Sequence, residues 1–347
     1  MLANAMLDRR SSDPAPDGPG AGPEPTVHDV SVVVPVYQGE KTLGALVADL
    51  GPLTGPSTTP RGHRFRVSEV ILVHDGAIDR SHEVIERLAQ THGFVIPVWL
   101  SRNFGQHPAT IAGMAATSGA WVATLDEDGR HDPQDIARLL DRALEAGAQL
   151  AYGTPTADPP HGLLRNAGSA MAKWISSTLL GCRQVGRFES FRLVEGEVAR
   201  SLAAYCGHGA YLDVALSWVV GRIAHCPVRP RAGAARPSGY DLPKLLAHFW
   251  RLVLTSGTRP LRLVALLGFA SIGFGLVLIG YALWGKLTGG APIAGWTSLM
   301  IAMSIFSGAV LFSLGIIAEY IGMALTMALG RPPFLVVSRP PHAGVRR

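Results

Sequence analysis

Two long stretches without a charged side chain constrain this chain more than any other feature. Leu263 to Trp284 covers 22 such positions, and Leu299 to Ala318 covers another 20. Each is long enough to cross about 30 Å of hydrocarbon as a helix. A soluble domain rarely needs two such helices, so a pair of buried core helices is the weaker interpretation. We therefore expect two transmembrane helices within residues 261–330.

Basic residues flank both stretches, whereas the short connection between them holds a single lysine. The positive-inside rule places such flanks in the cytoplasm. We therefore expect a multi-pass protein of the cell (inner or plasma) membrane, with its remaining domain and residues 331–347, a C-terminal tail, in the cytoplasm. The flanking arginines are Arg251, Arg259 and Arg262 before the first stretch, and Arg331, Arg339, Arg346 and Arg347 after the second.

The region just before the first stretch, residues 231–260, has an amphipathic pattern. Between Leu242 and Leu254 five apolar residues share one helical face, while Lys244, His248 and Arg251 lie elsewhere on the helix. This pattern is typical of a helix that lies in the membrane interface. A core helix of the soluble domain is the alternative.

Short apolar runs alternate with helical stretches between residues 28 and 153. Such alternation predicts an α/β domain of the Rossmann-like type, with a mostly parallel sheet covered by helices on both faces. Ligands of such sheets bind beyond the carboxyl ends of the strands. The expected strands include Val32–Val34, Val70–Val73, Val95–Leu100, Trp121–Leu125 and Leu150–Gly153, and the expected helices are Lys41–Leu50, Ser81–Thr91, His107–Ser118 and Gln134–Ala146.

The N-terminal composition, the net charge and the cysteine spacing limit the structure and the partners that we expect. Residues 1–27 are rich in Pro, Gly and Asp and predict a disordered tail. The net charge is +5, but no run of five Lys or Arg occurs, so nucleic acid is not an expected partner. Cys182, Cys206 and Cys226 lack the CxxC spacing of metal sites, and we expect reduced core residues.

The acidic sequence Asp126-Glu127-Asp128 follows an apolar strand and is the sharpest local signal of chemistry. Two carboxylates at positions i and i+2 of a strand end can bind a hard divalent cation, which prefers oxygen ligands. A cation held there can neutralise a diphosphate leaving group. Asp75 ends another strand, so the sheet is expected to bring it to the same crevice. By itself an Asp-x-Asp pattern is common in surface loops.

The sequence from Ser101 to Ile136, which contains this acidic turn, resembles the polyprenyl-phosphate branch of glycosyltransferase family 2. That branch includes dolichol-phosphate mannosyltransferases and undecaprenyl-phosphate glycosyltransferases. Further segments resemble the family in the same order, and together the resemblance covers about residues 28–340. These segments are Val30–Leu43, Val70–Ser81, Ser190–Val194, Arg231–Leu246 and Ala318–Val336.

The resemblance implies a GT-A type nucleotide-sugar domain at residues 28–230. It also implies inverting transfer of a sugar from a UDP- or GDP-linked donor to a polyprenyl phosphate, for cell-envelope glycosylation. Asp126 and Asp128 would bind Mg²⁺ or Mn²⁺, and Asp128 and Arg192 would act in catalysis. A homo-oligomer is left open. The residues implied to line the donor pocket are Pro35, Tyr37, Glu40, Asp75, Ser101, Arg102, Asn103, Asp126 and Arg231.

Several positions depart from the family pattern, and they cluster around the donor pocket. His74 and Ala77 replace an Asp and a Ser of one turn, and Gln38-Gly39 stands where Asn-Glu is usual. Glu127 replaces a small residue between the two aspartates, and Ser190 replaces an acid. These departures leave the nucleotide and the sugar undetermined.

Two other functions fit parts of the sequence. Gln184 to Phe188 imitates the Gln-x-x-Arg-Trp motif of processive polysaccharide synthases, but its aromatic residue is Phe and two spans make a poor polymer channel. A non-catalytic membrane scaffold that kept the fold is the second alternative, and intact Asp126 and Asp128 argue against it.

Overall fold

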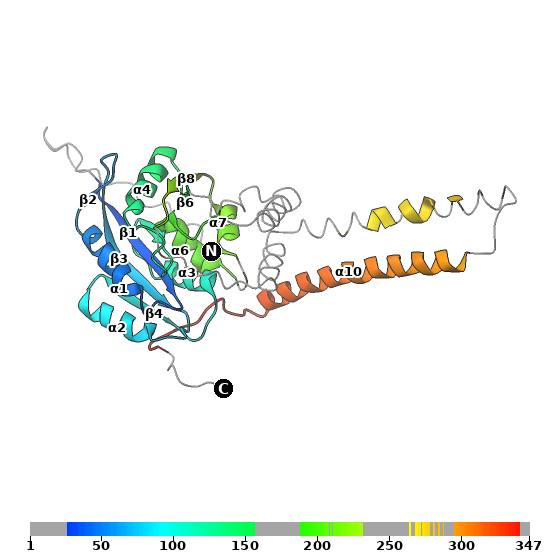
Figure 1. The fold of residues 1–347 in the computed structure, drawn as a ribbon, viewed down its shortest axis with the longest axis horizontal. Coiled ribbons are helices and arrows are strands. Elements are labelled where there is room, and N and C mark those ends of the chain that lie inside the picture. The colour runs from blue at the N-terminus through cyan, green and yellow to red at the C-terminus, as the bar shows by residue number, and fades with distance from the viewer. Residues whose placement is uncertain are drawn as a thin grey trace, which may run out of the picture.

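A nine-stranded sheet forms the centre of the folded domain (Figure 1). The structure is a computed structural model that describes residues 26–156, 188–231 apart from 208 and 210, scattered positions from 264 to 287, and 295–340. The strands are β1 (His28–Val36), β2 (Ser57–Thr58), β3 (Arg64–His74), β4 (Val95–Leu100), β5 (Trp121–Thr124), β6 (Leu150–Pro155), β7 (Arg192–Glu195), β8 (Ile223–Val228) and β9 (Val336–Val337).

The strand order is β8-β6-β7-β5-β1-β3-β4-β9, with β2 paired beside β3. The neighbours β5, β1, β3 and β4 are parallel, as the alternation of strands and helices predicts. β7 lies antiparallel between β5 and β6, and β9 lies antiparallel to β4. The sheet is therefore mixed rather than mostly parallel, and strands β2, β7, β8 and β9 were not predicted.

Helices cover both faces of the sheet, because apolar side chains alternate between the faces along each strand. Val32 and Val34 of β1 belong to an apolar cluster with residues of the helices at 43–50, 81–91 and 135–146. Val33 belongs to a second cluster with residues of the helices at 106–115, 196–205 and 212–219. The four predicted helices are confirmed, with small shifts of their ends, as α1 (Leu43–Leu50), α2 (Ser81–Thr91), α3 (Gln106–Ala115) and α4 (Asp135–Ala146). The helices η1 (Gly51–Thr54), α6 (Gly196–Tyr205) and α7 (Leu212–Val219) were not predicted.

One long apolar helix, α10 (Trp296–Ala328), extends away from this domain (Figure 1). Its segment Ile305–Ala328 has 24 residues, and only 6 % of the most apolar 18-residue stretch within it is buried. Within the described part of the chain, this is the one helix long and apolar enough to cross a membrane. The first predicted span and the predicted interfacial helix lie largely outside the described residues, as does the tail at 1–25. Two spans therefore stay a prediction.

After α10 the chain returns to the sheet. In β9, Val337 pairs with Trp99 and Val336 pairs with Leu100 at the edge of β4. Phe334 packs against the apolar cluster under α3. The described part of the predicted C-terminal tail thus contributes a short edge strand to the domain.

Candidate active site

The loops after β1, β3, β4 and β5 meet at one edge of the sheet, because these four strands are parallel. Pro35 lies in β1 near this edge, followed by the exposed side chains of Tyr37 and Glu40. Apart from Pro35 in β1 and Arg231, the sequence-predicted residues of the donor pocket come from these loops.

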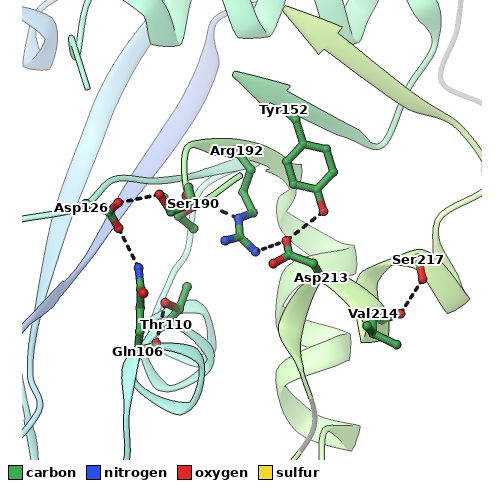
Figure 2. Close-up of polar contacts among 10 residues, drawn as sticks. Gln106, Thr110, Asp126, Tyr152, Ser190, Arg192, Asp213, Val214 and Ser217 are labelled. Carbon is green, nitrogen blue, oxygen red and sulfur yellow. Dashed lines mark hydrogen bonds and ion pairs between the residues drawn. The ribbon is translucent and has the colours of Figure 1, made fainter. Parts of the chain in front are cut away.

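Asp126 is held from two sides (Figure 2). Its Oδ1 accepts a hydrogen bond of 2.7 Å from Nε2 of Gln106, the first residue of α3. Its Oδ2 accepts one of 2.5 Å from the hydroxyl of Ser190, which precedes β7. The serine that replaces a family acid therefore donates to the expected metal ligand. These two contacts fix the direction of the Asp126 carboxylate.

Asp128 is paired within its own turn. Its carboxylate lies 3.0 Å from Nε of Arg130 and accepts a hydrogen bond from the backbone N–H of the same residue. His131 approaches the backbone N–H of Asp126 and stacks on Phe191. Burial lowers the pKa of His131, although the neighbouring carboxylates oppose that shift. The turn therefore presents two carboxylates beside a neutral imidazole.

Asp75 is buried and holds the loop before α3. Its carboxylate accepts hydrogen bonds from the backbone N–H groups of Phe104 at 2.7 Å and Gly105 at 2.8 Å. Burial raises its pKa, and these two hydrogen bonds oppose the rise. The backbone carbonyl of Asp75 accepts a further hydrogen bond from Nδ2 of Asn103. The structure thus brings Asp75 and Asn103 together.

The two residues before Asn103 face different surroundings. The exposed guanidinium of Arg102 lies over the ring of Phe104, 4.4 Å from its centroid. The backbone N–H of Ser101 donates to the carbonyl of Leu335, just before β9. The C-terminal segment therefore reaches the loop that follows β4.

Arg192 is buried, and Figure 2 shows its guanidinium directed at Asp213. Its Nη1 is 2.5 Å from Oδ1 of Asp213 in α7, and that same oxygen accepts a hydrogen bond of 2.9 Å from the hydroxyl of Tyr152. Its Nε donates weakly to the carbonyl of Ser190. Burial and the Asp213 carboxylate raise the pKa of Tyr152. Direct action of Arg192 in catalysis stays a prediction.

Sequence reasoning missed Asp213 and Tyr152. A signal was present, because Asp213 lies in the apolar segment Leu212–Val219, and a buried carboxylate requires a partner. The identity of that partner could not be inferred, since Arg192 lies 21 residues earlier in the chain, in strand β7.

Arg231, a predicted donor-pocket residue, connects two acidic side chains. Its guanidinium lies 2.5 Å from Asp49 of α1 and 2.9 Å from Asp132. Its backbone N–H donates to the carbonyl of Arg130. It therefore fastens the segment that follows the acidic turn to α1, and its predicted contact with the donor is untested.

Known proteins define the class to which this fold and site belong. The profile described as glycosyl transferase family 2 matches residues 31–201. The chain belongs to this family and is a glycosyltransferase with a GT-A-like mixed α/β fold. It is 30 % identical over 321 residues to the undecaprenyl-phosphate 4-deoxy-4-formamido-L-arabinose transferase of Edwardsiella ictaluri, covering 90 % of this chain and 94 % of that one.

Further relatives and solved structures are similar. The transferase of the same name from Pseudomonas aeruginosa is 29 % identical, covering 88 % of this chain and 89 % of that one. The glucosyl-3-phosphoglycerate synthase of Mycobacterium tuberculosis, solved with Mn²⁺ and UDP, has a TM-score of 0.46 at 20 % identity, covering 67 % of this chain and 80 % of that chain. TarS of S. aureus, solved with UDP-GlcNAc, has a TM-score of 0.44 at 16 % identity, covering 66 % of each chain.

Proposed function

We propose that this glycosyltransferase moves a sugar from a UDP- or GDP-linked donor to a polyprenyl phosphate at a membrane surface, with inversion at the anomeric carbon. The observation that carries the proposal is the acidic turn after β5, where Asp126 is held between α3 and the segment before β7. The acceptor class follows from relatives named as undecaprenyl-phosphate transferases, which match almost the whole chain.

A divalent cation such as Mg²⁺ or Mn²⁺ fits the residues at this turn. Metal-binding carboxylates are commonly oriented by hydrogen bonds from neighbours, as Gln106 and Ser190 orient Asp126. The described residues contain no group of three or more His, Cys, Asp or Glu suited to a metal. Mg²⁺ is often bound by one or two carboxylates, with substrate phosphates and water completing the shell. Asp126 and Asp128 would therefore hold the ion, which supplies charge neutralisation for the leaving nucleoside diphosphate.

The protein's own residues have the task of binding and orienting the two substrates. A polyprenyl phosphate is already anionic at neutral pH, so its oxygen needs no strong base to attack the anomeric carbon. The bond between that carbon and the nucleoside diphosphate breaks as the new one forms. What remains is to align the reacting groups, which can supply a large part of the rate.

The donor pocket is proposed at the loops after β1, β3 and β4. Tyr37 offers an exposed ring beside the acidic turn, and Asp75 fixes the loop that carries Asn103. Ser101 and Arg102 precede it, Glu40 follows Tyr37, and Pro35 lies half-buried in β1, one residue before its end. Arg192 and Arg231 would contact the donor phosphates only if their ion pairs with neighbouring aspartates break.

The membrane arrangement completes the proposal. Helix α10 would cross the bilayer together with the predicted span at 263–284, and residues 231–260 would lie in the interface. The domain formed by residues 28–230 would face the cytoplasm, so that the acceptor phosphate meets the donor at the membrane surface. The exposed apolar side chains of α10, such as Leu311 and Ile321, support this arrangement.

The test measures transfer by the purified full chain in detergent. Polyprenyl phosphate is incubated with UDP- and GDP-sugars, and lipid products are identified by mass. We expect one sugar per lipid, dependent on Mg²⁺ or Mn²⁺. Asp128→Asn should lower transfer at least about 100-fold, since metal stabilisation is worth several kcal/mol. Asp29→Asn, at the opposite edge of the sheet, is the control. Polymeric products, or full activity of Asp128→Asn, would contradict the proposal.

A further inference from the structure

We propose that Glu127, between the two expected metal ligands, is a positioning residue that holds the loop after β1 in its nucleotide-binding form. The inference rests on the proposed function, because it concerns the donor side of that same site. It assigns different tasks to the three consecutive acids: the outer two would hold the metal, and the middle one supports the loop that carries Tyr37.

The Glu127 carboxylate contacts two consecutive backbone N–H groups. Its Oε2 accepts a hydrogen bond of 2.9 Å from the N–H of Tyr37. The N–H of Gln38 lies 2.9 Å from Oε1 and 3.1 Å from Oε2. The partners are 90 and 89 residues apart in sequence, so these bonds connect two separate turns. Hydrogen bonds to an ionised acceptor are about twice as strong as neutral ones.

Gly39 gives this carboxylate the room that it needs. A Cβ atom at position 39 would lie 3.0 Å from Oε2 of Glu127 and 2.7 Å from Cγ of Leu43. Gly39 and Glu127 are both departures from the family pattern, and here they are neighbours in space. The glutamate that the family carries at position 39 is missing, and a glutamate from the neighbouring turn reaches the same loop.

The second half of the loop is hydrogen-bonded to the turn after β3 and to the first residue of α2. The N–H of Gly39 donates to the hydroxyl of Ser81 at 2.9 Å, and the N–H of Glu40 donates to Asp79 at 3.1 Å. Glu40 in turn accepts from the N–H of Arg80 at 3.3 Å. Four consecutive backbone N–H groups, from residue 37 to 40, are therefore bound by side chains of two other turns. Glu127 supplies the partner for the first two.

This arrangement fixes the backbone of Tyr37 while leaving its side chain 40 % exposed. A ring presented from a fixed backbone can contact a nucleotide without first being ordered, and pre-organisation of this kind raises affinity. Removal of Glu127 leaves two N–H groups of the loop without their carboxylate, so the loop must be ordered by the nucleotide itself. The effect should appear in nucleotide binding, including in the absence of metal.

The experiment measures binding of UDP and of GDP to the purified full chain by calorimetry, with EDTA and separately with Mn²⁺. Glu127→Ala should raise the Kd about 10- to 100-fold with EDTA present, because two charge-assisted hydrogen bonds are lost. Glu127→Gln should stay within about threefold of the wild type, since its amide oxygen still accepts from the backbone. Mn²⁺ affinity, followed by the signal of free Mn²⁺ in EPR, should be unchanged in both. Glu197→Ala, at an exposed site on α6, is the control.

Transfer kinetics provide a second readout. For Glu127→Ala the KM for the nucleotide-sugar should rise by a larger factor than kcat falls, as expected for a residue that positions the donor. If Glu127→Ala does not fold, Glu127→Gln alone decides: near wild-type binding supports the inference, and a loss as large as that of Asp128→Asn overturns it. Wild-type Kd for Glu127→Ala, or lost Mn²⁺ affinity in both variants, also overturns it. Failure of the wild type to bind either nucleotide would instead refute the proposed function.

Discussion

Replacement of Asp213 by Asn should destabilise the folded domain strongly, because it leaves the Arg192 charge buried without a counter-charge. The two side chains are only 5 % and 4 % exposed, and Tyr152 donates to the same carboxylate. Breaking a buried ion pair by removing one partner costs about 3–5 kcal/mol, most of it the cost of the charge left behind. The amide that replaces the carboxylate still accepts hydrogen bonds, so we expect the lower part of that range.

The expected loss converts into a large thermal shift. For a domain of this size, each 1 kcal/mol lowers Tm by roughly 2–4 °C, so a loss of about 3 kcal/mol in Asp213→Asn should lower Tm by roughly 6–12 °C. Tyr152→Phe removes a single hydroxyl from the network and should cost about 1 kcal/mol, or a few degrees. The loss of Tm should therefore be large for Asp213→Asn and small for Tyr152→Phe.

The assay is thermal unfolding of the full chain in detergent, followed by tryptophan fluorescence. The control is Asp29→Asn, which makes the same change in an ion pair with Arg66 whose side chains are 40 % and 52 % exposed. Exposed pairs of this kind contribute little to stability. If Asp213→Asn and Asp29→Asn unfold at the same temperature, the argument that Arg192 depends on a buried counter-charge is wrong.

Two further predictions concern the loops at the site. Burial lowers the pKa of His74 from 6.5 to about 4, and its ring nitrogens have no hydrogen-bond partner among the described residues. Between pH 6.5 and pH 4 this histidine binds a proton in the unfolded state but not in the folded state. The free energy of unfolding is therefore unaffected by His74 above pH 6.5, and it falls by up to about 3 kcal/mol as the pH drops to 4. Tm scans from pH 7 to pH 5 should decline less steeply for His74→Phe than for the wild type, and parallel curves would contradict the assignment. Gly76 has φ of +58°, and a Cβ there would lie 2.5 Å from the backbone nitrogen of Asn103. Gly76→Ala should therefore cost about 1–3 kcal/mol more than Gly62→Ala, which has φ of +93° but no atom within 4 Å of the added Cβ. Equal Tm values for these two variants would refute the close approach.

The candidate site could be predicted from sequence up to a definite point. The acidic turn and Asp75 each follow an apolar strand, and parallel strands bring such ends to one edge. The partners of these residues could not be predicted. Asp126 contacts Gln106 at a separation of 20 residues and Ser190 at 64, and no periodic pattern encodes such distances.

The sequence by itself determined the class of each element between residues 28 and 153, apart from the short elements η1 and β2, and the existence of a long apolar helix at α10. It could do so because strand and helix patterns have local periods of 2 and 3.6 residues, and because an uncharged stretch of membrane length is visible without any partner. Only the tertiary structure decided that β7 enters the sheet antiparallel, that Asp213 pairs with Arg192, and that Glu127 reaches the loop of Tyr37. Those features depend on which segments meet in space, and a polar side chain does not reveal in the sequence which distant backbone group or charge it will find.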